Sequence, residues 1–183
     1  MNSVKNRFAA TAATVSILLG LLGCSADEKT KAAPELPARI CWGAFAGNDV
    51  DPLLPAGDAI TQRVDPFYYS EHVRSLSCLV YVDGNYGFKA FATRKDSESE
   101  IDWSSWEQAH PKTTDAGKKA ISWDKGAVSY IPCKPTNSSP SFGTYVELEV
   151  TADNAPDEKR ARRILPVLLK QFVAFAEKEL KCR

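Results

Sequence analysis

The chain has 183 residues, with 23 basic and 23 acidic side chains, so its formal net charge is zero. Hydrophobic residues make up 44% of it, which is enough for one domain with a sizeable core. A chain without a positive field does not capture polyanions electrostatically, so the composition argues against nucleic-acid binding.

The first 23 residues have the pattern of an export signal. Lys5 and Arg7 precede an uncharged run from Phe8 to Leu22, as in the basic and apolar regions of a signal peptide. This run is shorter than the roughly 20 apolar residues of a membrane-spanning helix. The letters "LLGC" at 21–24 then resemble the bacterial lipobox, in which a small residue precedes a cysteine that becomes the lipid-modified N-terminus. The resemblance implies removal of a lipoprotein signal peptide (1–23) and lipidation of Cys24. An ordinary signal peptide and an uncleaved N-terminal membrane helix stay open as alternatives.

Residues 24–38 are rich in charge, alanine and proline and show no apolar period. Such a composition predicts a flexible tether. The remainder, 39–183, is predicted to form a single disulfide-bonded domain.

The cysteines beyond Cys24 predict two disulfides. There are four of them, an even number in an exported chain: Cys41, Cys78, Cys133 and Cys182. We favour Cys41–Cys78, which would fix the start of the domain to the first hairpin, and Cys133–Cys182, which would fix the last helix to a strand end. The crossed pairings stay open. A zinc site would need four distant segments to converge, since no C-x-x-C pair is present, so no metal is expected.

The apolar pattern predicts strands first and a helix last. Residues 47–65 are predicted to be a loop with one helical turn, and residues 76–94 a hairpin about Asp83-Gly84. Residues 95–119 are predicted to be a polar loop with a short helix near 99–108. A second hairpin follows, with its turn at Asp124 to Gly126. In the next strand (142–151), three apolar residues alternate with Glu147 and Glu149, which share the other face.

The end of the chain carries an apolar stripe at helical spacing. Because proline fits the first turn of a helix, Pro166 places the predicted start near Leu165, with 157–163 as a looser lead-in. Strands followed by a helix predict an α+β fold: an antiparallel sheet with the C-terminal helix packed on one face and two disulfides.

The lipobox, the short tether, the Cys41/Cys78 pair and the strand-then-helix order together resemble the small secreted lipoproteins of actinobacteria, a group of unknown function. The resemblance implies a curved antiparallel sheet with helices on one side. It also implies a place in the bacterial cell envelope, lipid-anchored on the extracytoplasmic face of the cell membrane, and it implies no reaction.

No catalytic motif stands out, and no cofactor is expected. The two histidines, His72 and His110, lack a nucleophile elbow or a spare thiol elsewhere in the sequence and are interpreted as surface or capping residues. The chain is therefore expected not to be an enzyme.

The aromatic residues are the better candidates for a ligand site. Trp103 and Trp106 are three residues apart and would share a helix face beside carboxylates, an arrangement suited to sugars or peptides. Tyr68 and Tyr69 form a second candidate patch. The competing interpretation is that these rings close the core beneath a loop.

These observations favour a membrane-anchored extracytoplasmic binding or protein-interaction module. Its expected partners are the membrane, through the lipid on Cys24, and an envelope protein or a small ligand. The alternative is a cell-envelope enzyme that acts on glycan through a carboxylate pair such as Asp102 and Glu107, although an acidic stretch is more often a solvated face. A third possibility is a purely structural envelope component.

Overall fold

The computed structural model describes residues 35–133 and 143–182. Cys24, the predicted signal peptide and most of the predicted tether lie outside them. In chain order the elements, with η marking 3-10 helices, are β1 (Arg39–Ile40), η1 (Cys41–Gly43), β2 (Phe45–Ala46), α1 (Gly47–Val50), η2 (Asp51–Leu53), β3 (Ile60–Val64), β4 (Ser75–Val82), β5 (Asn85–Lys95), η3 (Glu98–Glu100), η4 (Trp103–Ala109), β6 (Lys112–Thr114), β7 (Lys119–Ser122), β8 (Gly126–Pro132), β9 (Tyr145–Thr151) and α2 (Glu158–Leu180).

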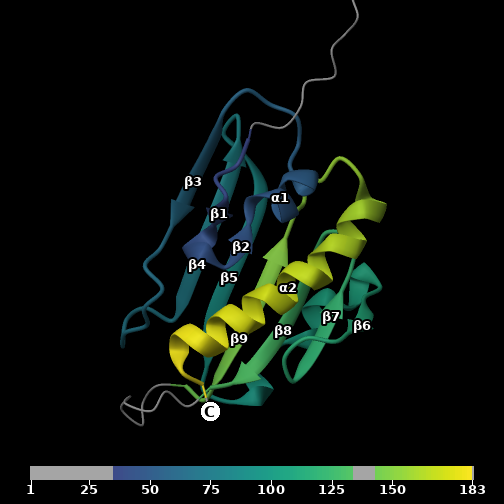
Figure 1. The fold of residues 1–183 in the computed structure, drawn as a ribbon. Coiled ribbons are helices and arrows are strands. Elements are labelled where there is room, and N and C mark those ends of the chain that lie inside the picture. The colour runs from purple at the N-terminus through teal and green to yellow at the C-terminus, as the bar shows by residue number, and fades with distance from the viewer. Residues whose placement is uncertain (1–34, 134–142, 183) are drawn as a thin grey trace, which may run out of the picture.

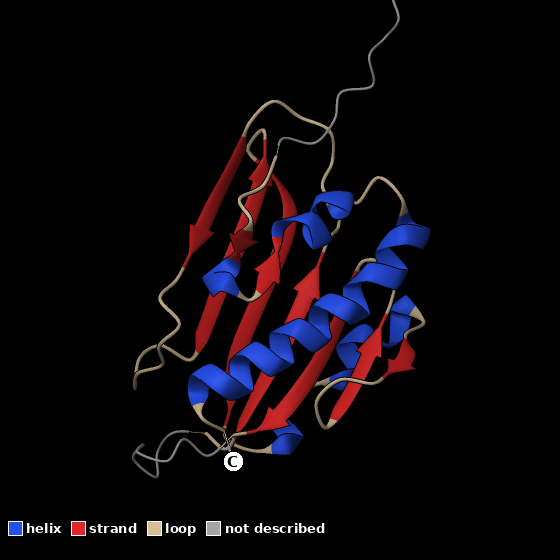
Figure 2. Ribbon diagram, in the orientation of Figure 1, coloured by secondary structure: helices blue, strands red, loops and turns tan. Residues whose placement is uncertain are grey.

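Seven strands form one antiparallel sheet in the order β3-β4-β5-β9-β8-β7-β6. It consists of two meanders, β3-β4-β5 and β6-β7-β8, and β9 lies between them as the central strand. The helix α2 crosses one face of this sheet, and α1 lies on the same side (Figure 1). Figure 2 shows the same layering, with the long helix in front of the strands. The α+β prediction, an antiparallel sheet with the C-terminal helix packed on one face, is confirmed.

The two predicted hairpins are present. Asp83 and Gly84, with φ values of 49° and 80°, form the two-residue turn between β4 and β5. Positive φ at both positions suits the right-handed twist of the strands, and glycine accepts it without strain. In the second hairpin the Trp123 backbone N–H donates to the Gly126 carbonyl at 2.8 Å and closes the turn between β7 and β8.

The main core lies between α2 and the sheet. The rings of Phe45, Phe88 and Phe172 are fully buried, with centroids 5.3 Å apart for Phe45–Phe88 and 5.5 Å apart for Phe45–Phe172. Burial of each such side chain contributes about 1.5–3 kcal/mol. Segments from β2, β5 and α2 are therefore held together by one aromatic group.

The chain joins this core before the predicted domain start. Leu36, inside the predicted tether, is 9% exposed and belongs to the core. The Gly47 backbone N–H donates to the Ala38 carbonyl at 3.0 Å, so the entering segment is also fixed to α1.

The predicted start of the last helix is wrong by about two turns, because α2 begins at Glu158. The Asp157 side chain accepts a hydrogen bond from the Arg160 backbone N–H at 3.0 Å and caps the helix. Ala161 is fully buried, so the apolar stripe extends ahead of Pro166. The proline lies in the helix interior and removes one backbone donor, a loss that packing and capping outweigh.

Both predicted disulfides are present. Cys41 pairs with Cys78, with Cα atoms 5.4 Å apart, and Cys133 pairs with Cys182, with Cα atoms 4.5 Å apart. The first bond joins the segment after β1 to β4. The second joins the end of β8 to the residue that follows the C-cap of α2.

Short strands were missed where burial does not alternate. β3 lies in the segment predicted as a loop, and all five of its residues are at least partly exposed, so no period of two marks it. It is placed by pairing with β4 and by the Asp83 side chain, which accepts from the backbone N–H groups of Asp58 at 3.1 Å and Ala59 at 2.9 Å. β6, at the other edge, was missed for the same reason. β1 and β2 have two residues each, which is too short to show a period.

Candidate functional site

The side chains of β9 alternate between the two faces of the sheet. Its apolar residues 146, 148 and 150 are buried in the main core beneath α2. Since successive side chains of a strand point to opposite faces, Tyr145, Glu147, Glu149 and Thr151 point away from α2. We call this second side the outer face of the sheet.

Five aromatic rings lie in contact on the outer face, and we call them the aromatic cluster: Trp103, Trp106, Trp123, Tyr130 and Tyr145. Centroid distances are 6.2 Å for Trp123–Trp106, 5.8 Å for Trp106–Trp103, 5.9 Å for Trp103–Tyr130 and 5.9 Å for Tyr130–Tyr145. The three tryptophans are half-buried and lie outside the main core. The cluster is thus a separate aromatic layer, partly open to solvent.

The two tryptophans of η4 lie on the sheet because of how that helix begins. Asp102 caps it, accepting from the Ser104 backbone N–H at 3.1 Å. In a 3-10 helix residues three apart share a face, so Trp103 and Trp106 both point toward the strands. Ahead of η4, Glu98 accepts a hydrogen bond from the Tyr130 hydroxyl and fixes the segment to β8.

Two lysines of the protein lie over rings of the cluster. The Lys119 Nζ is 4.1 Å from the Trp103 ring centroid. The Lys118 Nζ is 5.7 Å from the Tyr130 centroid and 5.9 Å from that of Tyr145, and it also binds Glu98 at 2.7 Å. Ammonium groups are attracted to ring faces at these distances, so the cluster already holds two cations.

Glu147 places a desolvated carboxylate beside these rings. Its side chain is only 13% exposed, and one oxygen, Oε1, is 3.5 Å from Lys95 Nζ. The other oxygen, Oε2, is buried and has no hydrogen-bond partner among the described residues. Burial raises the pKa of Glu147, Lys95 opposes this, and the charge of Asp102 adds to it.

Glu149 and Thr151 continue the line of oxygen atoms along β9. Burial raises the pKa of Glu149, and a hydrogen bond from Trp106 acts against it. Thr151 is 7% exposed, and its hydroxyl has no hydrogen-bond partner in the part of the chain that the structure describes. We call Glu147, Glu149 and Thr151 the β9 row. Together with the aromatic cluster it forms the candidate site.

The predicted ligand residues are divided between two regions. Trp103 and Trp106 belong to the aromatic cluster. Tyr68 lies in the loop between β3 and β4 and is 70% exposed, whereas Tyr69 is 9% exposed. The Tyr69 ring contacts Phe67 and lies 5.6 Å from the Arg94 guanidinium. No described ring contact joins either tyrosine to the tryptophans.

The carboxylates proposed for glycan chemistry are not desolvated. Asp102 and Glu107 are both exposed at η4. Asp102 interacts electrostatically with Glu147, and its charge raises the pKa of Glu147. Hydrogen bonding by Ser104 lowers the pKa of Asp102, which is the direction opposite to the shift at Glu147.

Sequence reasoning missed six residues of the site: Trp123, Tyr130, Tyr145, Glu147, Glu149 and Thr151. Their alternation along the strands was visible. It places Glu147 and Glu149 on one face but does not show that Trp106 of η4 bonds to Glu149. Within the described residues, no group of three metal-ligating side chains comes together, and both histidines are exposed.

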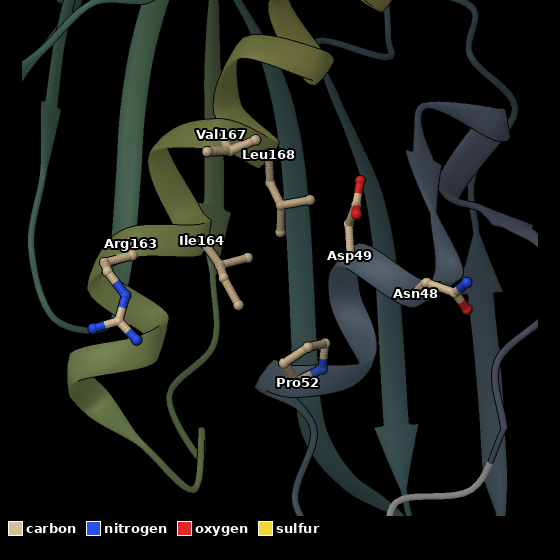
Figure 3. A pocket seen from close by; sticks show the side chains of 7 residues that line it. All are labelled: Asn48, Asp49, Pro52, Arg163, Ile164, Val167 and Leu168. Atoms are coloured by element: carbon tan, nitrogen blue, oxygen red, sulfur yellow. The ribbon is translucent and has the colours of Figure 1, made fainter.

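A shallow depression on the opposite side of the molecule is a weaker candidate. It lies between α2 and the α1–η2 segment, and Ile164 and Leu168 extend from the helix toward Pro52 and Asp49 (Figure 3). Its volume of about 260 Å³ is below the range usual for ligand pockets. The Asp49 carboxylate is already bound by the Gln171 side chain at 2.7 Å, and Asn48 and Arg163 are the other polar residues of the depression.

None of the helices in residues 35–133 and 143–182 combines the length and apolar composition that a bilayer span requires. Comparisons of the chain with protein-family models, with curated proteins and with solved structures found no match. A function for this chain is therefore argued from its sequence and from the geometry of the outer face.

Proposed function

We propose that the chain is a lipid-anchored extracytoplasmic binding module whose ligand surface is the outer face of the sheet. The observation that carries the proposal is that half-buried rings lie beside desolvated carboxyls. Trp106 donates a hydrogen bond to Glu149, and Glu147 is the cross-strand partner of Tyr130. Flat apolar rings next to a few fixed polar groups are a usual composition of saccharide and peptide sites. An envelope glycan or peptide fragment is the ligand that this surface suits.

The anchor is proposed from the lipobox-like letters at 21–24 and from the pairing of the other cysteines. Because Cys41, Cys78, Cys133 and Cys182 bond to one another, Cys24 has no disulfide partner in the chain. A diacylglyceryl thioether on Cys24 would hold the domain at the membrane, and two acyl chains make such an anchor stable. This location at the membrane agrees with the resemblance to actinobacterial secreted lipoproteins.

Membrane fractionation tests the anchor separately from the ligand. We expect the wild-type protein in the membrane pellet and the Cys24→Ser variant in the soluble or secreted fraction. Mass spectrometry of the N-terminal peptide should show the acyl groups. A Cys24→Ser protein that stays firmly in the pellet would contradict lipid anchoring.

Tryptophan fluorescence tests the binding surface, since three of the four tryptophans belong to the cluster. We expect soluble fragments of envelope glycan and peptide to shift the emission. Trp106→Ala should weaken binding about tenfold, a loss of roughly 1.4 kcal/mol and close to the value of one good aromatic contact. Tyr68→Ala, which removes an exposed ring elsewhere, is the matched control. A complete set of fragments without effect would refute the proposal.

A second candidate function is an envelope enzyme that acts on glycan. The observation that favours it is that the pKa values of two interacting carboxyls are shifted in opposite directions: that of Asp102 is lowered and that of Glu147 is raised. Such a pair can supply a base and an acid. Turnover of a cell-wall glycan that is lost in Asp102→Asn and Glu147→Gln but kept in Glu107→Gln would establish this enzyme. Equal turnover in all three would exclude this pair.

A further inference from the structure

We infer that the outer face recognises its ligand through ammonium groups: the β9 row accepts N–H donors from a compound that carries more than one amino group. This inference rests on the proposed binding function and names the ligand chemistry. The ligand class is an oligoamine, either an oligomer of an amino sugar or a linear polyamine.

The first argument is the state of the oxygen atoms in the row. Glu147 Oε2 and the Thr151 hydroxyl are buried and unpaired in the described structure, and Glu149 lies between them on the same face of β9. A buried acceptor without a donor keeps the full penalty of its desolvation. An ammonium group offers three donors and no acceptor. It can therefore donate hydrogen bonds to these oxygens without adding an acceptor that would itself need a donor.

The second argument is charge. Four acids face this part of the sheet: Glu98, Asp102, Glu147 and Glu149. Three lysines face it as well, Lys95, Lys118 and Lys119, while Lys89 is bound to Asp153. The balance is one negative charge, and two of the four carboxyls, Glu147 and Glu149, are largely desolvated. An anionic ligand would be repelled there, and a neutral one would leave that charge uncompensated.

The third argument is that the aromatic cluster already binds ammonium groups. Lys119 lies over Trp103, and Lys118 lies over Tyr130 and Tyr145. No described lysine or arginine lies over Trp106 or Trp123. Both rings are half-buried, and Trp106 bonds to Glu149, so an ammonium of the ligand would meet a ring and a carboxylate there in the same geometry.

The fourth argument is the length of the row. From Glu147 to Thr151 the strand rises by roughly 13 Å, at about 3.3 Å per residue. One ammonium group cannot contact both ends of such a row. A ligand with several amino groups along a chain can satisfy it.

Calorimetric titration at neutral pH with matched probes tests the inference. The probes are a glucosamine oligomer and spermidine, each compared with its N-acetylated form, which keeps the skeleton and loses the charge. We expect at least one free amine to bind tenfold or more tighter than its acetylated form. Which of the two binds distinguishes an amino-sugar source from a polyamine source.

Variants locate the binding. Glu147→Gln and Glu149→Gln keep the shape of the side chain and should each reduce the amine affinity about tenfold. Glu107→Gln, an exposed acid on η4, should leave it unchanged. Circular dichroism of each variant separates loss of binding from loss of fold.

The outcomes also separate this inference from the proposed function. Equal affinity for the amines and their acetylated forms, or an amine preference that survives both Glu→Gln changes, would overturn the ammonium inference. The binding function would still stand if envelope fragments shifted the tryptophan emission. If neither amine bound, the ammonium inference would be wrong. If, in addition, no envelope fragment shifted the tryptophan emission, the binding function would be wrong as well.

Discussion

Glu147 combines three properties that are rarely found together at a strand position. It lies on the central strand, its side chain is 13% exposed, and one of its oxygens has no partner in the described structure. Lys95, the nearest cation, does not outweigh the burial, so the pKa of the carboxyl is raised. Such a residue costs stability in the free protein, which is the usual condition of groups kept for binding.

The raised pKa of Glu147 gives a prediction for stability against pH. The folded state holds this proton more tightly than the unfolded chain, so the carboxyl destabilises the fold at neutral pH, and this cost disappears as pH falls through the folded-state pKa. An amide in place of the carboxyl does not titrate. We expect Glu147→Gln to unfold at a higher temperature than wild type at pH 7, by about 1 kcal/mol in free energy, a usual size for one substitution. The difference should shrink at pH 4.

Thermal unfolding at the two pH values measures this difference. Glu107→Gln, at an exposed position, is the control and should stay within about 0.5 kcal/mol of wild type at both. A Glu147→Gln variant that is less stable than wild type at pH 7 would show that the bond to Lys95 outweighs the desolvation of the carboxylate.

The sequence predicts which side chains share a face, because local spacing determines this. It does not predict which of them are buried, because burial depends on distant segments. Trp103 and Trp106 share a face because they are three apart, and this holds in η4. Glu147 and Glu149 share a face because they are two apart, and this also holds. The environment of Glu149 depends on Trp106 of η4, which bonds to it from 43 residues earlier in the chain, and no local pattern records such a contact.

The elements follow the same division. The hairpin at Asp83-Gly84 was predictable because the turn chemistry and the alternating strands agree. β3 was missed because an exposed edge strand needs no apolar period. The start of α2 was misplaced because proline is a strong local signal, and the buried Ala161 and the Asp157 cap outweigh it.

Pro166 gives a prediction at the scale of the helix. It lies in the interior of α2, where it has no N–H to donate to the Arg162 carbonyl, and proline there is about 3 kcal/mol less favourable than alanine. We expect Pro166→Ala to raise the free energy of unfolding by about 1–3 kcal/mol in urea denaturation. Asp157→Ala should lower it by about 1 kcal/mol through loss of the cap. Destabilisation by Pro166→Ala would mean that its ring makes packing contacts worth more than the missing hydrogen bond.

At the scale of the whole molecule, β9 joins two local meanders into one sheet. Each meander pairs strands that are consecutive in sequence, whereas β9 pairs with β5 across 50 to 62 residues. The candidate site forms only after this strand is inserted, because the β9 row and Tyr145 come from β9, whereas the other rings come from η4, β8 and the turn between β7 and β8. The two disulfides connect the remaining distant parts, one at the start of the domain and one at its end.

The two disulfides should differ in importance, and their burial decides the order. They join residues 37 and 49 apart, for which loop closure predicts about 4 kcal/mol each and a difference of roughly 0.2 kcal/mol in favour of the longer loop. Cys41 and Cys78 are 1% and 0% exposed in the core, whereas in the second pair Cys133 is 1% exposed and Cys182 is only half-buried. Serine at both core positions buries two hydroxyls at about 1–3 kcal/mol each where they lack partners. We therefore expect Cys41→Ser with Cys78→Ser to destabilise the domain more than Cys133→Ser with Cys182→Ser in denaturant titrations.

Cys24→Ser, the control, should leave the unfolding midpoint unchanged. The reverse order for the two pairs would mean that the longer loop, rather than burial in the core, determines the stability that each bond contributes.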